Sequence, residues 1–145
     1  MYDLMIIGSG PAGISAALTA KARNLNFIWF GSRALSTKIE KAEKIMNYPG
    51  LPAVTGSEMQ SVFLKQIDDC DITITEAQVN SIYDCGGYFA AGADNEIYEA
   101  KSVIMTVGMT TTREIEGEAR LLGCGVSYCA TCDGALYKNK DIAVI

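Results

Sequence analysis

The N-terminal third of the chain alternates between short apolar runs and glycine-containing turns. Residues 2–7 are largely apolar and lead directly into the turn Gly8-Ser9-Gly10-Pro11-Ala12-Gly13. The next segment, 14–23, is rich in alanine and other small residues, which let a helix pack closely on a sheet. A second apolar run at 26–30 ends at Gly31-Ser32. This pattern predicts a strand, a tight turn, a helix and a second strand.

The periodicity of the apolar residues changes beyond residue 54. At 57–70 apolar residues recur at helical spacing, which predicts a helix with Ser57 as its N-cap. Short apolar or alternating runs then predict strands at 72–75, 79–83, 88–91, 96–100 and 103–107. We expect an irregular segment at 33–54 with a turn at 47–50, a helical turn at 117–123 and a final strand at 141–145.

The composition is that of a globular domain and disfavours several classes of function. The 145 residues are 49% hydrophobic and 20% charged, with a net charge of -5 and no basic stripe, so nucleic acid is not an expected partner. No apolar segment approaches the ~20 residues that span a bilayer and no secretory signal is found, so we expect a cytoplasmic protein outside the membrane. Histidine is absent, which excludes histidine-based triads and histidine zinc ligands in this chain.

The turn at 8–13 has the spacing Gly-x-Gly-x-x-Gly and stands between a predicted strand and a predicted helix. In that setting the first glycine permits a sharp turn, the second lets the backbone approach a pyrophosphate, and the third lets helix and strand pack closely. We therefore predict that the turn binds a dinucleotide. The acidic residue that usually binds the ribose is missing, because Phe30 and Gly31 stand at the end of the second strand. Backbone groups, Ser32 or the following loop are expected to take that role.

Three of the five cysteines lie within nine positions, at Cys124, Cys129 and Cys132. Their spacing also opens plant-type [2Fe–2S] sites, but no fourth cysteine follows, and a four-cysteine zinc site would need a second close pair. Burial as small apolar residues suits the two other cysteines better than this polar run. We favour a redox-active pair, Cys129 and Cys132, at a helix N-terminus that stabilises a thiolate, with Asp133 as acid or base. No metal ligand is predicted.

Together these motifs resemble those of the low-molecular-weight thioredoxin reductases, which are FAD enzymes with a redox-active Cys-x-x-Cys in the nicotinamide domain. The resemblance runs along essentially the whole chain. It is densest at 125–134, which contains Cys-Ala-Thr-Cys-Asp. Its other parts are the glycine turn, Asn47-Tyr48-Pro49-Gly50, and Thr106-Val107-Gly108 in the place of the family's Ala-Thr-Gly.

The resemblance implies an α/β fold. A Rossmann-like FAD-binding domain at 1–112 would be built on a parallel sheet with a β-meander inserted at about 79–100. A hinge and the start of a second α/β nucleotide-binding domain, which carries the redox cysteines, would follow at 113–145. We therefore expect the chain to be truncated, the first half of a reductase about twice as long.

The resemblance also implies roles for individual residues. The glycine turn would bind the pyrophosphate of FAD. Cys129 and Cys132 would form the disulfide, with Cys132 nearer the flavin, and Asp133 would be the acid or base. The other residues expected at the cofactor are Phe30, Gly31, Ser32, Asn47, Val79, Thr106, Val107 and Gly108.

The activity implied by the resemblance is the reduction of thioredoxin, or of a similar small dithiol protein, by a homodimer. Electrons would pass from reduced FAD through the Cys129–Cys132 disulfide. The electron donor stays open between NADPH and reduced ferredoxin, because residues 33–38 replace the family's usual Gly-Gly-Gln. A dithiol oxidase of the same architecture and a flavin-binding fragment without activity are the alternatives.

Overall fold

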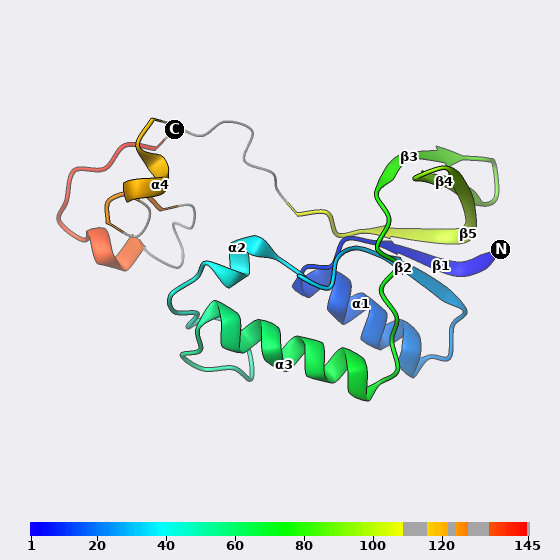
Figure 1. Ribbon diagram of the computed structural model, residues 1–145, viewed down its shortest axis with the longest axis horizontal. Helices are drawn as coiled ribbons and strands as arrows, with labels where there is room; N and C mark the ends of the chain where they lie inside the picture. The colour runs from blue at the N-terminus through cyan, green and yellow to red at the C-terminus, as the bar shows by residue number, and fades with distance from the viewer. Residues whose placement is uncertain (109–115, 122–123, 128–133, 145) are drawn as a thin grey trace. The chain divides into compact units, whose positions relative to one another are not determined.

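The computed structural model describes residues 1–108, 116–121, 124–127 and 134–144 (Figure 1). The chain divides into two compact units, of which the first comprises residues 1–43 and 55–108. Residues 44–54 and 109–145 belong to the second unit. The first unit contains the sheet and the glycine turn. The predicted domain boundary between residues 112 and 113 stays a prediction.

The first unit begins with the predicted strand, turn, helix and strand. Its elements are β1 (Tyr2–Ile7), α1 (Pro11–Ala22), β2 (Phe27–Phe30), α2 (Thr37–Glu40), α3 (Gly56–Asp69), β3 (Val79–Asp84), β4 (Phe89–Ala93) and β5 (Glu96–Met105). The one-turn helix α2 lies in the segment expected to be irregular, and it forms because the Ser36 side chain caps it by accepting a hydrogen bond from the Ile39 N–H. In the described part of the chain, no helix is both long and apolar enough to cross a bilayer.

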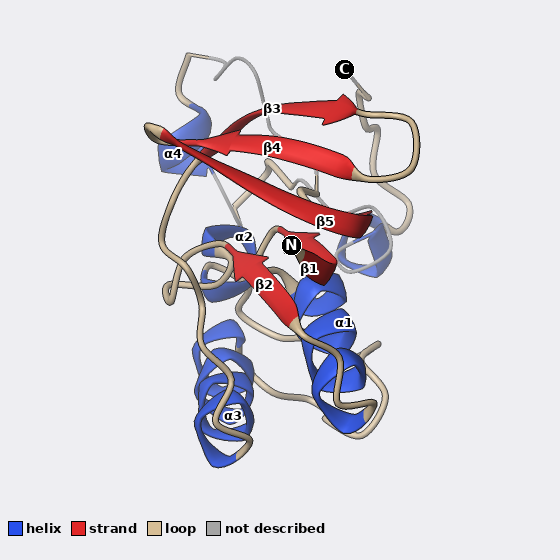
Figure 2. Cartoon of the chain, turned by 90° about the vertical axis from the view of Figure 1, so that its right-hand side faces the viewer, coloured by secondary structure: helices blue, strands red, loops and turns tan. Residues whose placement is uncertain are grey.

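The five strands form one sheet in the order β2-β1-β5-β4-β3 (Figure 2). β1 pairs in parallel with β2 and β5, whereas β3, β4 and β5 form an antiparallel meander. The predicted α/β fold with a parallel sheet and an inserted meander is thus confirmed. The predicted strands at 96–100 and 103–107 are one strand, β5. Ala100 pairs with both Phe89 of β4 and Tyr2 of β1, so the strand passes from the meander into the parallel sheet without a break.

Alternate side chains of β1 face two different layers of the fold. Met5 and Ile7 belong to the core cluster, whose other members are Ile28, Phe30, Ala91, Ala93 and Ala100. Leu4 and Ile6 point to the opposite face, the face on which α1 lies (Figures 1 and 2). All four side chains are buried. Because both faces of β1 are covered, its sequence reads as a continuous apolar run rather than as an alternating one.

The N-terminus of α3 lies upstream of its predicted position. Thr55, not Ser57, is the N-cap: its Oγ1 accepts a hydrogen bond from the Glu58 N–H at 3.2 Å. In return the Glu58 carboxylate accepts one from the Thr55 N–H at 2.8 Å, and this bond lowers the pKa of Glu58. The reciprocal pair satisfies two backbone donors, which a cap at Ser57 would not do.

Two predicted strands are not formed. The segment 72–75 makes a single parallel bridge, between Thr75 and Phe30. Residues 141–144, the described part of the predicted final strand, have no regular structure and are exposed. Apolar alternation alone does not make a strand, since its backbone groups must also find a hydrogen-bonded neighbour along their length.

The described residues of the second unit form short elements. A β-turn at 48–51 is closed by a hydrogen bond from the Leu51 N–H to the Tyr48 carbonyl. Gly50 in this turn has φ +83°, as a type II turn requires after Pro49. This confirms the predicted turn. Helix α4 (Glu118–Leu121) lies within the predicted helical turn, and a short 3₁₀ helix, η1, spans Gly134–Tyr137.

We predict that Asp3→Asn lowers the stability of the protein at pH 7. The Asp3 carboxylate accepts hydrogen bonds from Lys101 Nζ at 2.7 Å and from the Asn26 N–H at 3.1 Å, which connects β1 with β5 and with the start of β2. The Lys101 and Asn26 bonds, in that order, lower the pKa of Asp3 below its ordinary value of 3.8. A lowered native pKa means that the ionised carboxylate stabilises the fold above pH ~4, and that this contribution is lost as the pH falls through the native pKa.

Urea unfolding followed by circular dichroism at pH 7 and at pH 3 measures this effect. The difference between wild type and Asp3→Asn should be present at pH 7 and shrink at pH 3. The exposed Asp141 provides the control, since Asp141→Asn should change the unfolding midpoint at neither pH. An Asp3→Asn difference of equal size at both values would show that the charge of Asp3 contributes nothing.

Candidate dinucleotide-binding site

Two of the three glycines in the turn at 8–13 are required by the packing of the chain on itself. Gly8 follows β1 with φ +113°, and a Cβ there would lie 2.3 Å from the Thr106 carbonyl oxygen. A Cβ on Gly13 would lie 1.9 Å from the Gly8 carbonyl oxygen. Both neighbours are backbone atoms, which cannot rotate out of the way. Positions 8 and 13 therefore need glycine for folding, whatever the turn binds.

Gly10 differs from the other two glycines because its surroundings are open. Among the described residues, a Cβ there would have no atom within 4 Å apart from its chain neighbours and the backbone of α1, and the backbone angles of φ -72° and ψ -179° suit any residue. Gly10 is the N-cap of α1 and has no side chain with which to accept a hydrogen bond from the first turn. Pro11, in that turn, has no N–H to donate. The remaining N–H groups of that turn stay available to an outside acceptor. Space and donors at a helix N-terminus are what a phosphate needs.

The carbonyl of Gly8 is held from two sides. Trp29 of β2 donates from its indole Nε1 to this oxygen at 2.9 Å. The hydroxyl of Thr106, just after β5, lies 3.0 Å from the same oxygen and 2.9 Å from the Ile7 carbonyl. Trp29 is almost fully buried, so its N–H needs a partner inside the protein. Sequence analysis singled out Thr106 but missed Trp29, although a lone tryptophan in a buried strand signals such a bond.

Ser9 connects the glycine turn with the loop after β2. Its buried Oγ accepts a hydrogen bond from the Ser32 N–H at 2.9 Å and donates one to the Leu35 carbonyl at 3.2 Å. Gly31 packs directly on this side chain. The structure thus brings together Ser9, Gly31 and Ser32, three of the residues that the sequence assigned to the cofactor.

The other predicted residues of the first unit occupy different environments. Phe30 is 1% exposed and meets the Tyr98 ring edge-on, with 5.0 Å between the ring centroids. The side chain of Val79 packs against the core cluster. Val107 is exposed, and Gly108 has φ +68°, a conformation that favours glycine. The side chain of Phe30 is therefore buried in the core, whereas that of Val79 is half-buried against it.

A comparison with protein families identifies the chain. The model of the family described as "Pyridine nucleotide-disulphide oxidoreductase" matches residues 2–145. The chain belongs to this family. The match includes both the glycine turn of the first unit and the Cys-x-x-Cys segment.

Relatives within the disulphide oxidoreductase family are about twice as long as this chain. The crystal structure of a ferredoxin-flavin thioredoxin reductase from Clostridium acetobutylicum is 48% identical, with a TM-score of 0.75 over 94% of this chain and 47% of that one. A thioredoxin reductase structure from Streptococcus pyogenes is 35% identical, with a TM-score of 0.79 over 94% of this chain and 45% of that one. The thioredoxin reductase of Ureaplasma parvum is 35% identical over 146 residues, which span all of this chain and 47% of the relative.

The residues expected to carry the disulfide chemistry of this family lie outside the described residues. These are Cys129, Cys132 and Asp133; the described chain resumes at Gly134, where η1 begins. Cys70, Cys85 and Cys124 have free thiols. Within the described ranges, histidine, cysteine and carboxylate side chains form no group of three suited to a metal. Asn47, expected near the flavin, is exposed in the second unit.

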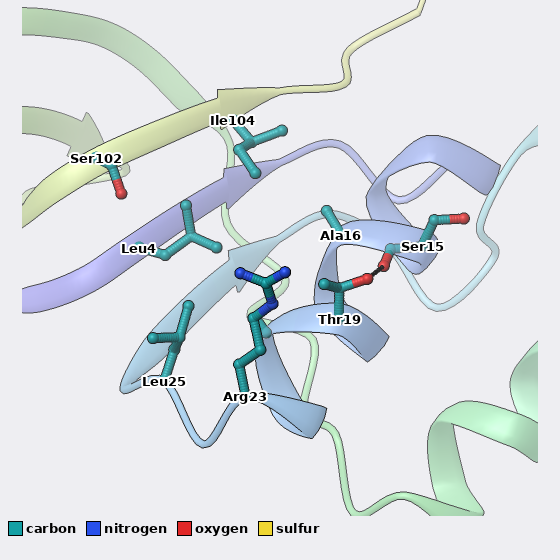
Figure 3. A pocket seen from close by; sticks show the side chains of 9 residues that line it. Leu4, Ser15, Ala16, Thr19, Arg23, Leu25, Ser102 and Ile104 are labelled. Atoms are coloured by element: carbon teal, nitrogen blue, oxygen red, sulfur yellow. Dashed lines mark hydrogen bonds between the residues drawn. The ribbon is translucent and has the colours of Figure 1, made fainter.

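A shallow groove lies apart from the glycine turn, between α1 and strands β1 and β5 (Figure 3). Leu4, Ala16 and Ile104 contribute apolar surface, and Arg23 is the charged residue in its lining. Among the residues that the structure describes, none of those assigned to a site by the sequence lines this groove. The lining given by the described residues includes no cysteine, so these residues offer no thiol for the chemistry of a disulphide oxidoreductase.

Proposed function

We propose that the protein containing this chain is an FAD-dependent thioredoxin-disulfide reductase. The observation that carries the proposal is the open space at Gly10, beside an uncapped helix N-terminus, in a chain that belongs to the disulphide oxidoreductase family. Gly8 and Gly13 have a reason to be glycine without any ligand, whereas Gly10 has none. A pyrophosphate that approaches the backbone supplies that reason.

The glycine turn and the loop after β2 would hold the cofactor. In this proposal the first N–H groups of α1 donate to the pyrophosphate, and Trp29 and Thr106 keep the turn in place through the Gly8 carbonyl. Ser9 positions the backbone of Gly31 and Ser32 for the ribose. Bound FAD would supply the pair of electrons that the disulfide takes up.

The proposed chemistry of the chain itself is thiol–disulfide exchange. The Cys129–Cys132 disulfide takes up two electrons and two protons and opens to a dithiol, with Asp133 passing one of the protons. A thiolate of this pair attacks the disulfide of thioredoxin, forms a mixed disulfide and displaces one thioredoxin sulfur. The second thiolate of the pair attacks the mixed disulfide, which restores Cys129–Cys132 and releases thioredoxin with two thiols.

We further propose reduced ferredoxin as the electron donor. The relative named for ferredoxin has a higher sequence identity to this chain, 48%, than the two compared relatives named simply thioredoxin reductase, at 35%. Residues 33–38 also depart from the family's usual Gly-Gly-Gln, in a loop that varies as well among the relatives that use ferredoxin. NADPH is the second candidate, because the matched relatives from Bacillus subtilis, Ureaplasma parvum, Mycoplasma pneumoniae and Listeria innocua carry the plain thioredoxin reductase name. A cytoplasmic homodimer with residues 113–145 in a second domain completes the proposal.

Anaerobic stopped-flow mixing of the full-length protein tests both the activity and the donor. We expect a yellow protein whose flavin absorption bleaches with reduced ferredoxin and not with NADPH. When oxidised thioredoxin is added, thiol titration should show two new thiols on thioredoxin for each electron pair consumed. Bleaching by NADPH alone would replace the donor, and a colourless protein, or one that forms no thioredoxin thiols with either donor, would contradict the proposed function.

A further inference from the structure

Dinucleotide-binding folds usually place an acidic residue for the ribose at the end of the second strand, but here Phe30 is buried in the core and Gly31 cannot carry a side chain. A Cβ on Gly31 would lie 2.5 Å from the Cβ and 2.7 Å from the Oγ of Ser9. Ser9 is buried, and its Oγ is held by the Ser32 N–H and the Leu35 carbonyl, so it cannot move aside without losing both bonds. A carboxylate for the ribose must therefore come from another segment.

The segment after α3 runs beside the end of β2. The Thr75 N–H donates to the Trp29 carbonyl at 2.7 Å, and the Thr75 carbonyl accepts from the Gly31 N–H at 3.2 Å. Residue 76 therefore lies next to the end of β2, at the carboxyl edge of the parallel strands. Ligands of open α/β sheets bind at this edge, and residue 76 is a glutamate.

The Glu76 carboxylate is oriented by the loop after β2. Its Oε1 accepts a hydrogen bond from the backbone N–H of Arg33 at 2.9 Å. Its Oε2 accepts none from the residues that the structure describes, and the side chain is exposed. One oxygen thus fixes the position of the group, and the other is available to a ligand.

The guanidinium of Arg33 forms its ion pair with Asp68 and not with Glu76. Its Nη2 donates to both carboxylate oxygens of Asp68, at 3.0 and 3.1 Å, and this pair directs the guanidinium toward α3. An arginine in this loop would otherwise suit a 2′-phosphate. With Arg33 engaged by Asp68, the loop presents a carboxylate instead.

We propose that Glu76 is the acceptor for the 2′- and 3′-hydroxyls of the adenosine ribose of FAD. This inference rests on the proposed function and names the residue that selects the nucleotide. A carboxylate accepts hydrogen bonds from vicinal hydroxyls and repels a phosphate at the 2′ position, so the site prefers an unphosphorylated ribose. The acidic residue missing from the end of β2 is supplied from 45 positions further along the sequence than Gly31.

Calorimetric titration of the full-length protein, freed of flavin and shown to rebind FAD, tests the assignment with ADP, 2′-deoxy-ADP and 3′-deoxy-ADP. We expect wild type to bind one or both deoxy analogues about tenfold more weakly than ADP, the size of one or more hydrogen bonds to a charged acceptor. In Glu76→Gln, which keeps an oxygen for the Arg33 N–H, ADP should bind about tenfold more weakly and no tighter than the analogues. Asp69→Asn removes an exposed carboxylate from the last turn of α3 and should change none of these affinities.

The outcomes separate this inference from the proposed function. If Glu76→Gln preserves the wild-type preference for ADP over both analogues, another group binds the ribose and the inference is wrong, while FAD binding stands. If wild type does not distinguish ADP from its analogues, no acceptor binds the hydroxyls and the inference also fails. A wild-type protein that rebinds neither FAD nor ADP would overturn the inference together with the proposed function.

Discussion

Gly13→Ala should lower the free energy of unfolding by about 3 kcal/mol or more, whereas Gly10→Ala should lower it by about 1 kcal/mol or less. The new Cβ at position 13 would lie 1.9 Å from the Gly8 carbonyl oxygen. That oxygen is held by Trp29 and Thr106, so neither the turn nor the helix can give way without breaking those bonds. At position 10 the new methyl group would meet no atom of the described residues beyond its own neighbours in the chain.

The position with the smaller effect on stability, Gly10, should have the larger effect on flavin binding when folded variants are compared. Gly10→Val should weaken FAD binding by at least about 100-fold, because its side chain enters the space needed by the pyrophosphate. Its far-ultraviolet circular dichroism should stay close to that of wild type. Urea unfolding and fluorescence titration with FAD measure the two effects. Trp29, the one tryptophan in these 145 residues, lies beside the turn, so its fluorescence responds to both.

Either of two results would contradict this division of roles. If Gly10→Val retains stoichiometric FAD with wild-type affinity, the glycine turn does not bind the pyrophosphate. If Gly13→Ala is as stable as wild type, the chain can move to relieve the contact with the Gly8 carbonyl. Glycine is then not required at position 13 for folding. Gly86→Ala offers a control for the loss of a glycine at a position without nearby atoms, in the β3–β4 turn. It should cost stability through its φ of +73° and leave FAD binding unchanged.

Cys132→Ser should reduce the rate of thioredoxin reduction by a factor of at least about 10³ and leave FAD bound. A serine hydroxyl neither forms the disulfide with Cys129 nor exchanges with a disulfide of thioredoxin, so the path for electrons ends at the flavin. The substitution changes none of the residues proposed to bind FAD. Turnover with thioredoxin and the flavin content of the purified variant are the two measurements.

Cys124 supplies the matched control for this prediction. It is a free, exposed cysteine five positions before Cys129, and Cys124→Ser should keep both flavin and activity. Loss of activity in Cys124→Ser together with release of iron would instead support the iron–sulfur alternative, in which Cys124 is a ligand. Full activity in Cys132→Ser would refute the role of the cysteine pair.

Sequence reasoning recovered most of the elements of the first unit, and its errors have physical causes. β1, α1, β2 and the β3–β4 hairpin follow from runs and turns that are local in sequence. The break predicted within β5 was wrong. The strand continues because Ala100 pairs both with β4 and with β1, and no local pattern reveals such pairing. The N-cap of α3 was assigned to Ser57 rather than to Thr55, although Thr55 and Glu58 already have capping-box spacing.

The candidate site divides in the same way. The spacing of its glycines indicated the turn, but the structure was needed to separate Gly10, which is open, from Gly13, which packing requires. Ser9 was assigned to the turn on the basis of its neighbours, and the structure added its bonds to the loop after β2. Trp29 and Glu76 carried no motif, and the structure placed Trp29 against the Gly8 carbonyl and Glu76 against the Arg33 N–H.

The amino-acid sequence by itself determined the strand–turn–helix unit, the α/β fold and the resemblance to a disulfide reductase. It could do so because apolar periodicity and the steric need for glycine are properties of residues close together in the chain. Only the tertiary structure decided which groups hold the turn and which carboxylate stands beside the end of β2. Those contacts join residues 21 to 98 positions apart, and their partners are set by the packing of the sheet rather than by any local pattern.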